Sequence, residues 1–416
     1  MVSAEQPAAV EYTKKALSSM HIQGATRETL PPVGDWRWVP ARRRRWHPPS
    51  LRRGRMWCHT GRRVRPILPC RSGYAKGHRR LVSAAPVCDA PGMERPRGYG
   101  ACHFVGRWFT RYPGFWSTIT PGASVACRVS GTRNVGVRIQ IAPRQSLAPA
   151  IAWSVDGSSF RRAVCLPDPP VVGEHRVPVE VLADPKPHII RLVVSGIRET
   201  DPLWMEGAGL HFGGLVVDSG GIVEPAPAPN RYVLFLGDSI TAGINALGRG
   251  SVPAVNAAET AYPRVASDRL RLDCYPLGFG AIGITRGGNG GVPPASGVLD
   301  HSMHACPVGE TPPPVAVVVN LGTNDRSADA RSFADGYHAY LRLVRGRYPS
   351  VPVLCMRPFV GCFAHEIAAA AEEVGGIYVD TTDWNVQTSD GVHPGPSGHE
   401  TAGRRLADML GSLVEA

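Results

Sequence analysis

Three side chains in the C-terminal half of this chain have the types and spacing that acyl transfer requires. Ser239 follows Gly237 and Asp238, and a serine hydroxyl becomes a nucleophile when a neighbouring base takes its proton. His393 can be that base, because an imidazole titrates near pH 6.5. Asp390 precedes His393 by three residues, a spacing that lets its carboxylate reach Nδ1 of the ring and leave Nε2 free for Ser239. The simpler alternatives are a helix-capping serine and an ordinary surface turn.

Two further segments can stabilise the negative charge that develops on a carbonyl oxygen during such a reaction. Asn324 lies in Asn320-Leu-Gly-Thr-Asn-Asp325 and carries an amide NH₂ group. A donor aimed at a developing oxyanion contributes roughly 3–4 kcal/mol to transition-state stabilisation. The segment 278–283 contains three glycines, which let backbone N–H groups approach a ligand closely. The alternatives are an Asx-type turn at Asn324 and a tight strand-to-helix turn at 278–283.

All of these residues follow predicted strands of a single sheet. Residues 232–236 are apolar or aromatic throughout, as in a strand that is buried on both faces. Strands alternate with helical patterns after residue 231, which predicts a parallel sheet covered by helices on both faces. The carboxyl ends of such strands lie at the edge where ligands bind. The predicted strands are 232–236, 273–277, 315–320, 351–356 and 377–380, and the predicted helices are 259–272, 330–348, 363–374 and 397–413.

The preceding segment has a different pattern. Residues 98–222 contain about nine short apolar runs, some of them alternating, with turn residues between them. This spacing predicts an antiparallel β-sandwich or jelly roll. Residues 223–230, Val-Glu-Pro-Ala-Pro-Ala-Pro-Asn, predict an extended linker. We therefore expect a β-sandwich domain over 93–222, a Pro-rich linker over 223–230 and a third domain, with the parallel sheet, over 231–416.

The N-terminal segment carries the positive charge of the chain. Residues 1–92 hold 18 Lys and Arg against 5 Asp and Glu, whereas the rest holds 28 against 29. Residues 1–92 have no sustained periodicity, which predicts a disordered basic tail rich in Arg and Trp. Weak binding of a polyanion through residues 36–80 is one hypothesis, and a solvated extension without a partner is the alternative we favour.

Composition excludes several other classes of protein. No apolar run of 18 residues is present, so we expect no membrane span, and no secretory leader is visible, so a cytoplasmic location is the default expectation. The ten cysteines are scattered without a C-x-x-C pair, so we expect most to be free, with one or two bridges left open. His301, His304 and Cys306 match no strong metal-binding spacing. We expect neither a cofactor nor a metal.

Together these segments resemble the SGNH, or GDSL-type, hydrolase family. Gly237-Asp-Ser-Ile240 is similar to its first block, Gly322-Thr-Asn-Asp325 to its third and Asp390-Gly-Val-His393 to its last. Gly283 is the best match to the oxyanion glycine of the second block, although that block usually opens with Asn and Gly278 stands near that place here. The resemblance implies a flavodoxin-like fold for 231–413, a Ser239-His393-Asp390 triad, and an oxyanion hole formed by the Ser239 and Gly283 N–H groups and the Asn324 side chain.

The β-rich domain ahead of the hydrolase domain narrows the resemblance. This order, and the opening Phe104-Val-Gly-Arg-Trp-Phe, are similar to two-domain carbohydrate esterases that remove acetyl groups from xylan-like polysaccharides. Such a protein is expected to hydrolyse acetyl esters on carbohydrate. Asp238 is a candidate residue of the substrate pocket, and so is Trp384, which lies between the last predicted strand and Asp390. Packing at the rim is an equal alternative for Trp384. The alternatives are an SGNH hydrolase of short-chain lipid esters or thioesters, and a glycan- or nucleic-acid-binding protein with a silent catalytic domain.

Overall fold

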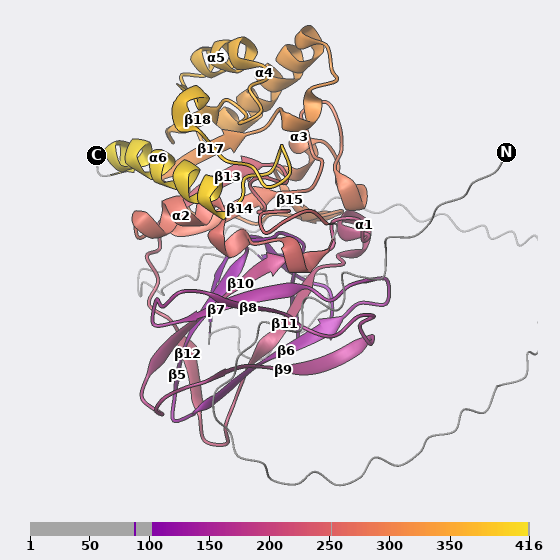
Figure 1. Ribbon diagram of the computed structural model, residues 1–416, viewed down its shortest axis with the longest axis vertical. Coiled ribbons are helices and arrows are strands. Elements are labelled where there is room, and N and C mark those ends of the chain that lie inside the picture. The colour runs from indigo at the N-terminus through magenta and orange to yellow at the C-terminus, as the bar shows by residue number, and fades with distance from the viewer. Residues whose placement is uncertain (1–86, 89–101, 251, 415–416) are drawn as a thin grey trace, which may run out of the picture. The chain divides into compact units, whose positions relative to one another are not determined.

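Alternating apolar residues build the first domain as two β-sheets. In β6 (Asn134–Ile141), Val135, Val137, Ile139 and Ile141 are buried and the residues between them are not, as expected for a strand with one face on a core. The computed structural model describes residues 87–88, 102–250 and 252–414 (Figure 1), and the predicted basic tail 1–92 lies almost wholly outside these ranges, as does the proposed polyanion-binding segment 36–80. The observed strands confirm the predicted antiparallel sandwich, in which only the β1–β3 pair is parallel.

Each sheet of the sandwich has six strands. The first has the order β1 (Val87–Cys88), β3 (Trp108–Thr110), β4 (Trp116–Thr118), β11 (Leu210–Val217), β6 and β9 (Gly173–Val181). The second has the order β12 (Ile222–Pro225), β5 (Ser124–Ser130), β10 (His188–Gly196), β7 (Ala150–Val155) and β8 (Arg161–Val164), with β2 (His103–Val105) also paired to β5. Strand β12 therefore places Val223, Glu224 and Pro225 in a sheet, although they were expected to begin the linker.

The C-terminal domain is a parallel five-stranded sheet with the order β14 (Asp273–Gly278), β13 (Tyr232–Gly237), β17 (Ala316–Asn320), β18 (Val353–Met356) and β19 (Ile377–Val379). In chain order the strands run 2-1-3-4-5, the flavodoxin-like arrangement. This sheet confirms the predicted fold class. The polar segments that follow β13, β14 and β17 all leave the sheet at its carboxyl edge.

Helices cover both faces of this sheet (Figure 1). Val233 and Phe235 of β13 pack against a core that includes α2 (Tyr262–Arg269) and α6 (Pro396–Val414). Leu234 and Leu236 face the opposite way, into a core that includes α4 (Ala330–Arg347) and α5 (Ala364–Glu373). Because successive strand residues point to opposite faces, burial on both faces explains why the apolar run 232–236 is continuous.

The loop 285–314 is partly ordered into short elements. It contains α3 (Ala295–Val298) and a hairpin of β15 (His301–Met303) and β16 (Cys306–Pro307). The buried guanidinium of Arg107, in the turn before β3, donates hydrogen bonds to the carbonyl oxygens of Val298, Leu299 and His301. One side chain of the sandwich thus satisfies three backbone carbonyl groups of this loop.

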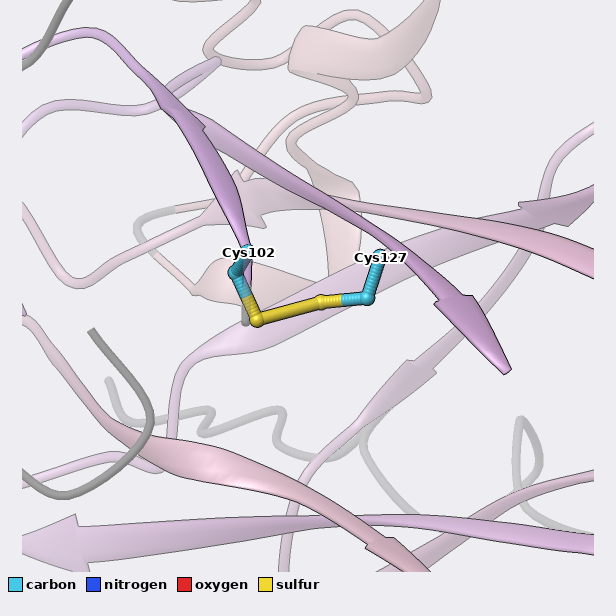
Figure 2. Close-up of a disulfide and its surroundings, with 2 residues drawn as sticks. All are labelled: Cys102 and Cys127. Carbon is cyan, nitrogen blue, oxygen red and sulfur yellow. A yellow bond between two sulfur atoms is a disulfide. The ribbon is translucent and has the colours of Figure 1, made fainter. Parts of the chain in front are cut away.

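One disulfide connects two strands of the second sheet. In the antiparallel register of β2 and β5, His103 lies opposite Ala126, which brings Cys102 opposite Cys127 with a Cα–Cα distance of 4.7 Å (Figure 2). The sequence left one or two bridges open, and the structure identifies this pair. Cys165, Cys274 and Cys355 are free and buried, and Cys362 is free and partly exposed. No helix in the described ranges is long and apolar enough to cross a membrane.

Candidate active site

Ser239 is presented by a turn that begins where β13 ends. The Asp238 carboxylate accepts a hydrogen bond from the Ile240 N–H at 2.9 Å, and the Asp238 carbonyl oxygen accepts one from the Ala242 N–H at 3.1 Å. Gly237 allows this turn, because a Cβ at that position would lie 1.9 Å from the Thr241 hydroxyl oxygen. The turn leaves the Ser239 hydroxyl at the carboxyl edge of the sheet.

Asp390 and His393 lie in a second turn, just before α6. One oxygen of Asp390, Oδ1, accepts the N–H groups of Val392 and His393 at 3.0 and 2.8 Å. The other, Oδ2, lies 2.8 Å from His393 Nδ1, and His393 Nε2 lies 2.8 Å from Ser239 Oγ. A carboxylate at Nδ1 fixes the tautomer in which Nδ1 carries the proton, so that Nε2 accepts from the serine hydroxyl.

Hydrogen bonds keep Asp390 ionised. Its burial alone would raise the pKa of the carboxyl group, but the His393 N–H, the His393 ring and the Val392 N–H together lower that pKa to about 2. Asp390 is therefore a carboxylate throughout the neutral range. It can hold the imidazole in place and stabilise the imidazolium that forms when His393 takes a proton.

Asn324 and the Ser239 backbone offer donors beside the serine. Asn324 lies in the 3-10 turn Thr323–Asp325 after β17, and its Nδ2 donates to the Ile282 carbonyl oxygen at 2.8 Å. Its other contact is a long one, 3.5 Å from Nδ2 to Asp238 Oδ2. Within the part of the chain that the structure describes, no hydrogen bond occupies the Ser239 N–H. The Ser239 N–H can therefore donate to an oxygen bound next to it, and Asn324 can offer the second Nδ2 proton, which its 3.5 Å contact with Asp238 holds only weakly.

Gly283 has a different place from the one expected. Its N–H donates to the Arg286 carbonyl oxygen at 3.0 Å, so it is not free to bind an oxyanion. A Cβ at Gly283 would lie 2.6 Å from both carboxylate oxygens of Asp325. That carboxylate accepts the N–H groups of Ile284 and Thr285 at 3.0 and 2.8 Å. Gly283 thus lets Asp325 anchor the loop, and its expected role as an oxyanion donor does not fit this geometry.

The two candidate pocket residues lie in the interior. Asp238 has no exposed surface, and burial raises the pKa of its carboxyl group to about 6. Trp384 is 7% exposed and packs with Phe359 and residues of α6 in the core on the α2/α6 face of the sheet. Both side chains are therefore covered largely by their own domain, and their part in a substrate pocket stays a prediction.

Sequence reasoning missed three residues that support the Asp390 turn. Asn245 Nδ2 donates to Asp390 Oδ2 at 3.3 Å, and Arg249 donates to the Asp390 carbonyl oxygen at 2.9 Å. Asn256 in turn accepts the Asn245 N–H through Oδ1 at 3.1 Å. The available signal was weak: Asn245 adopts a positive φ of 56°, a conformation that favours Asn and Gly, but turns often contain Asn.

His301, His304 and Cys306 do not form a ligand cluster. Across the described residues, no group of three His, Cys, Asp or Glu side chains has the arrangement of a metal site.

The part of the chain that carries this site is similar to known proteins. Residues 235–401 match the model of the GDSL-like Lipase/Acylhydrolase family. Over 144 residues, the chain is 28% identical to the cellulase/esterase CelE of Acetivibrio thermocellus, a match that covers 31% of this chain and 17% of CelE. The chain thus corresponds to a small part of that curated relative.

Two solved structures share the fold over both domains. A family two carbohydrate esterase from Clostridium thermocellum, an active-site mutant in complex with a cello-oligosaccharide, matches with a TM-score of 0.63 and 18% identity, covering 76% of this chain and 98% of that one. The acetyl xylan esterase Est2A from Butyrivibrio proteoclasticus matches with a TM-score of 0.61 and 18% identity, covering 76% and 95%. These similarities extend the shared architecture to the β-sandwich.

Proposed function

We propose that this chain, an ester hydrolase whose residues 235–401 form a GDSL-like lipase/acylhydrolase domain, removes acyl groups, in particular acetyl groups, from carbohydrate. The observation that carries the mechanism is the continuous set of contacts from Asp390 through His393 to Ser239, each 2.8 Å long. The substrate class rests on the family and on the shared two-domain fold. One relative is described as a cellulase/esterase, and one structure with this fold is described as an acetyl xylan esterase.

In the first half of the reaction, Ser239 Oγ attacks the ester carbonyl carbon while His393 Nε2 takes the hydroxyl proton. The electron pair of the carbonyl moves to its oxygen, and the Ser239 N–H and Asn324 Nδ2 donate to that oxyanion. When the tetrahedral intermediate collapses, the bond to the sugar oxygen breaks. His393 returns the proton to that oxygen, which leaves as a sugar hydroxyl, and the acyl group stays on Ser239.

In the second half, water replaces the sugar. His393 takes a proton from water as the water oxygen attacks the acyl carbon, and the same two donors hold the new oxyanion. Collapse releases the carboxylic acid and returns the proton to Ser239 Oγ. Asp390 keeps its charge throughout, which follows from its depressed pKa of about 2. No step requires a group beyond these side chains, one backbone N–H and water.

The test measures acetate release from acetylated xylo-oligosaccharides and compares kcat/KM with that for 4-nitrophenyl butyrate. The expected result is a higher kcat/KM on the acetylated sugar, and loss of both activities in Ser239→Ala. Faster turnover of the butyrate would favour the alternative of other short-chain esters. A folded protein that binds the oligosaccharide but releases no acetate would favour a binding protein and contradict the proposal.

A further inference from the structure

Two asparagines outside the mechanism connect the β-sandwich to the catalytic turn. We propose that Asn245, held by Asn256, is a positioning residue for Asp390, and that β8 and β10 of the sandwich fix this pair in place. The inference rests on the proposed function, because it assigns a role in the same reaction. According to this inference, residues of the sandwich help to orient His393 through Asn256, Asn245 and Asp390.

The contact between Asn245 and Asp390 is the first step. Asn245 Nδ2 donates at 3.3 Å to Oδ2 of Asp390, the same oxygen that lies 2.8 Å from His393 Nδ1. A second donor on that oxygen restricts the orientation of the carboxylate, and with it the orientation of the ring. Ser389 Oγ also donates to the Asn245 carbonyl oxygen at 2.7 Å. Asn245 therefore contacts the catalytic turn through both its side chain and its backbone.

The amide of Asn245 is itself fixed. Its Oδ1 accepts the Gly250 N–H at 3.2 Å, which directs the NH₂ group towards Asp390. Its backbone has a φ of 56°, and its N–H donates to Asn256 Oδ1 at 3.1 Å. Asparagine adopts this left-handed conformation more easily than other residues with a side chain. The backbone of Asn245 thus depends on Asn256.

Asn256 lies where the hydrolase domain contacts the sandwich. It is 3% exposed, and its Nδ2 donates to the Ile197 carbonyl oxygen just after β10 at 3.3 Å. Gly196, the last residue of β10, packs so closely that a Cβ there would lie 2.7 Å from the Asn256 Cβ. The Ser195 hydroxyl donates to the Asn256 carbonyl oxygen at 3.3 Å. Three consecutive residues of the sandwich therefore hold this one side chain and its backbone.

Arg162 of β8 completes the connection. Its guanidinium donates to the carbonyl oxygens of Asn256 at 2.6 Å and of Ala254 at 2.8 Å. It also lies 3.3 Å from the carboxylate of Glu259, whose side chain is 2% exposed. A buried carboxylate needs a charged partner, so removal of Arg162 would free the 253–259 segment to move. The neighbouring Arg161 instead pairs with Glu180 inside the sandwich.

The first test separates positioning from general structural support by using two substitutions at Asn245. Asn245→Gly keeps the left-handed backbone and removes the donor. Asn245→Asp keeps the shape and the acceptor for Gly250 but places a carboxylate beside Asp390. We expect both to lower kcat on 4-nitrophenyl acetate about 10- to 100-fold with KM changed less than about threefold. A matched control is Asn230→Gly, at a residue with a φ of 55°, which should keep wild-type kcat.

The second test measures coupling. In an Asp390→Ala background, where the contact no longer exists, Asn245→Gly should change kcat less than about threefold. Arg162→Met should lower kcat about tenfold in the wild-type background and less than threefold in the Asn245→Gly background, whereas Arg161→Met should leave kcat unchanged. Equal losses in both backgrounds, or wild-type kcat in Asn245→Asp, would overturn the inference.

A readout without substrate distinguishes this inference from the proposed function. The proton on His393 Nδ1 gives an NMR signal whose position reports its bond to Asp390, and Asn245→Gly should shift it while Asn230→Gly should not. If the wild-type protein hydrolyses no ester, the proposed function fails, whatever this signal does. If the wild-type protein is active but the signal is unchanged in Asn245→Gly, the positioning role fails alone.

Discussion

Oδ2 of Asp390 lies 2.8 Å from Nδ1 of His393 within a turn of four residues, and Nε2 of that ring lies 2.8 Å from Ser239 Oγ, 154 positions away. The first contact is local and the second spans the whole hydrolase domain. The first contact orients the imidazole of His393, and the second brings that imidazole within hydrogen-bond distance of the serine hydroxyl. Each can be tested separately, because different substitutions break them.

Replacement of Asp390 tests the local contact. Asp390→Asn keeps the size of the side chain but can present an NH₂ group to Nδ1, which favours the wrong tautomer, so we expect kcat to fall by about 10⁴-fold. The measurement is kcat on 4-nitrophenyl acetate between pH 5 and 9. A loss of less than tenfold would show that His393 works without this carboxylate.

Protonation of Asp390 should lower the stability of the folded protein at acidic pH. Its pKa of about 2 in the folded protein lies below the ordinary value of 3.8, so its ionised form stabilises the fold at pH values above about 4. That contribution is lost as the pH falls from about 4 towards 2. Between pH 4.5 and 3, the melting temperature of the wild-type protein should therefore fall further than that of Asp390→Asn. Parallel melting curves for the two proteins would contradict this expectation.

Ionisation of Asp238 should lower the stability of the folded protein as the pH rises, which is the opposite pH dependence to that of Asp390. Burial raises its pKa to about 6, above 3.8, so the folded state binds the proton more tightly and loses stability as the pH rises from about 4 to 6. The cost of the buried charge above pH 6 is on the order of 3 kcal/mol. Asp238→Asn keeps an acceptor for the Ile240 N–H, so it should raise the melting temperature relative to wild type at pH 8 but less so at pH 4.5. An equal effect at both pH values would refute the assignment.

Asn324 and Gly283 should give different defects. Asn324→Ala removes a donor to the oxyanion, and we expect kcat to fall about 10²- to 10³-fold with little change in KM. Gly283→Ala puts a methyl group 2.6 Å from the Asp325 carboxylate, so we expect a lower melting temperature from strain in the loop. Steady-state kinetics and thermal denaturation of both variants separate the two roles. An unchanged kcat in Asn324→Ala would remove it from the oxyanion hole.

The Cys102–Cys127 bridge should stabilise the sandwich. The closed loop spans 25 residues, which corresponds to about 3 kcal/mol of loop entropy in the unfolded chain. Cys102→Ser and Cys127→Ser should each lower the free energy of unfolding by about this amount, and the double variant should be little worse than either. Additive losses in chemical denaturation would mean that the two residues do not act as a pair.

Truncation tests the boundary of the catalytic unit. Strand β1 at Val87–Cys88 pairs with β3, and a chain of residues 78–416 keeps this strand. A chain of residues 78–416 should therefore retain wild-type kcat/KM. A chain that begins at residue 103 loses both β1 and the disulfide, and should melt at a lower temperature. Loss of activity in the chain of residues 78–416 would assign a role to the deleted residues 1–77.

Much of this protein could be predicted because its signals are local. The continuous apolar run 232–236 predicts a doubly buried strand, and the alternating residues 135–141 predict a strand with one buried face. Both predictions were confirmed, because side-chain periodicity follows directly from strand geometry. Asp390 and His393 could be paired for a similar reason, since a turn of four residues limits where two such side chains can lie.

Other features depend on contacts that no short segment contains. Gly283 resembles an oxyanion glycine in sequence, but its N–H donates to the carbonyl oxygen of Arg286. This contact depends on the conformation of the loop, which Asp325 fixes by accepting the Ile284 N–H. Trp384 looked like a pocket wall because it precedes Asp390, yet it packs in the core on the α2/α6 face. Its position in the chain did not indicate which side of the domain its ring would face.

By itself, the sequence determined the class of each domain, the order of the functional segments and the residue types available for acyl transfer, because these follow from periodicity and turn chemistry. Only the tertiary structure decided that Ser239 meets His393, that Cys102 pairs with Cys127, and that Asn245 and Asn256 link the sandwich to Asp390. Those relationships depend on the register of strands and on the packing of one domain against the other. They are fixed by burial and hydrogen bonding among distant residues, which a linear pattern does not record.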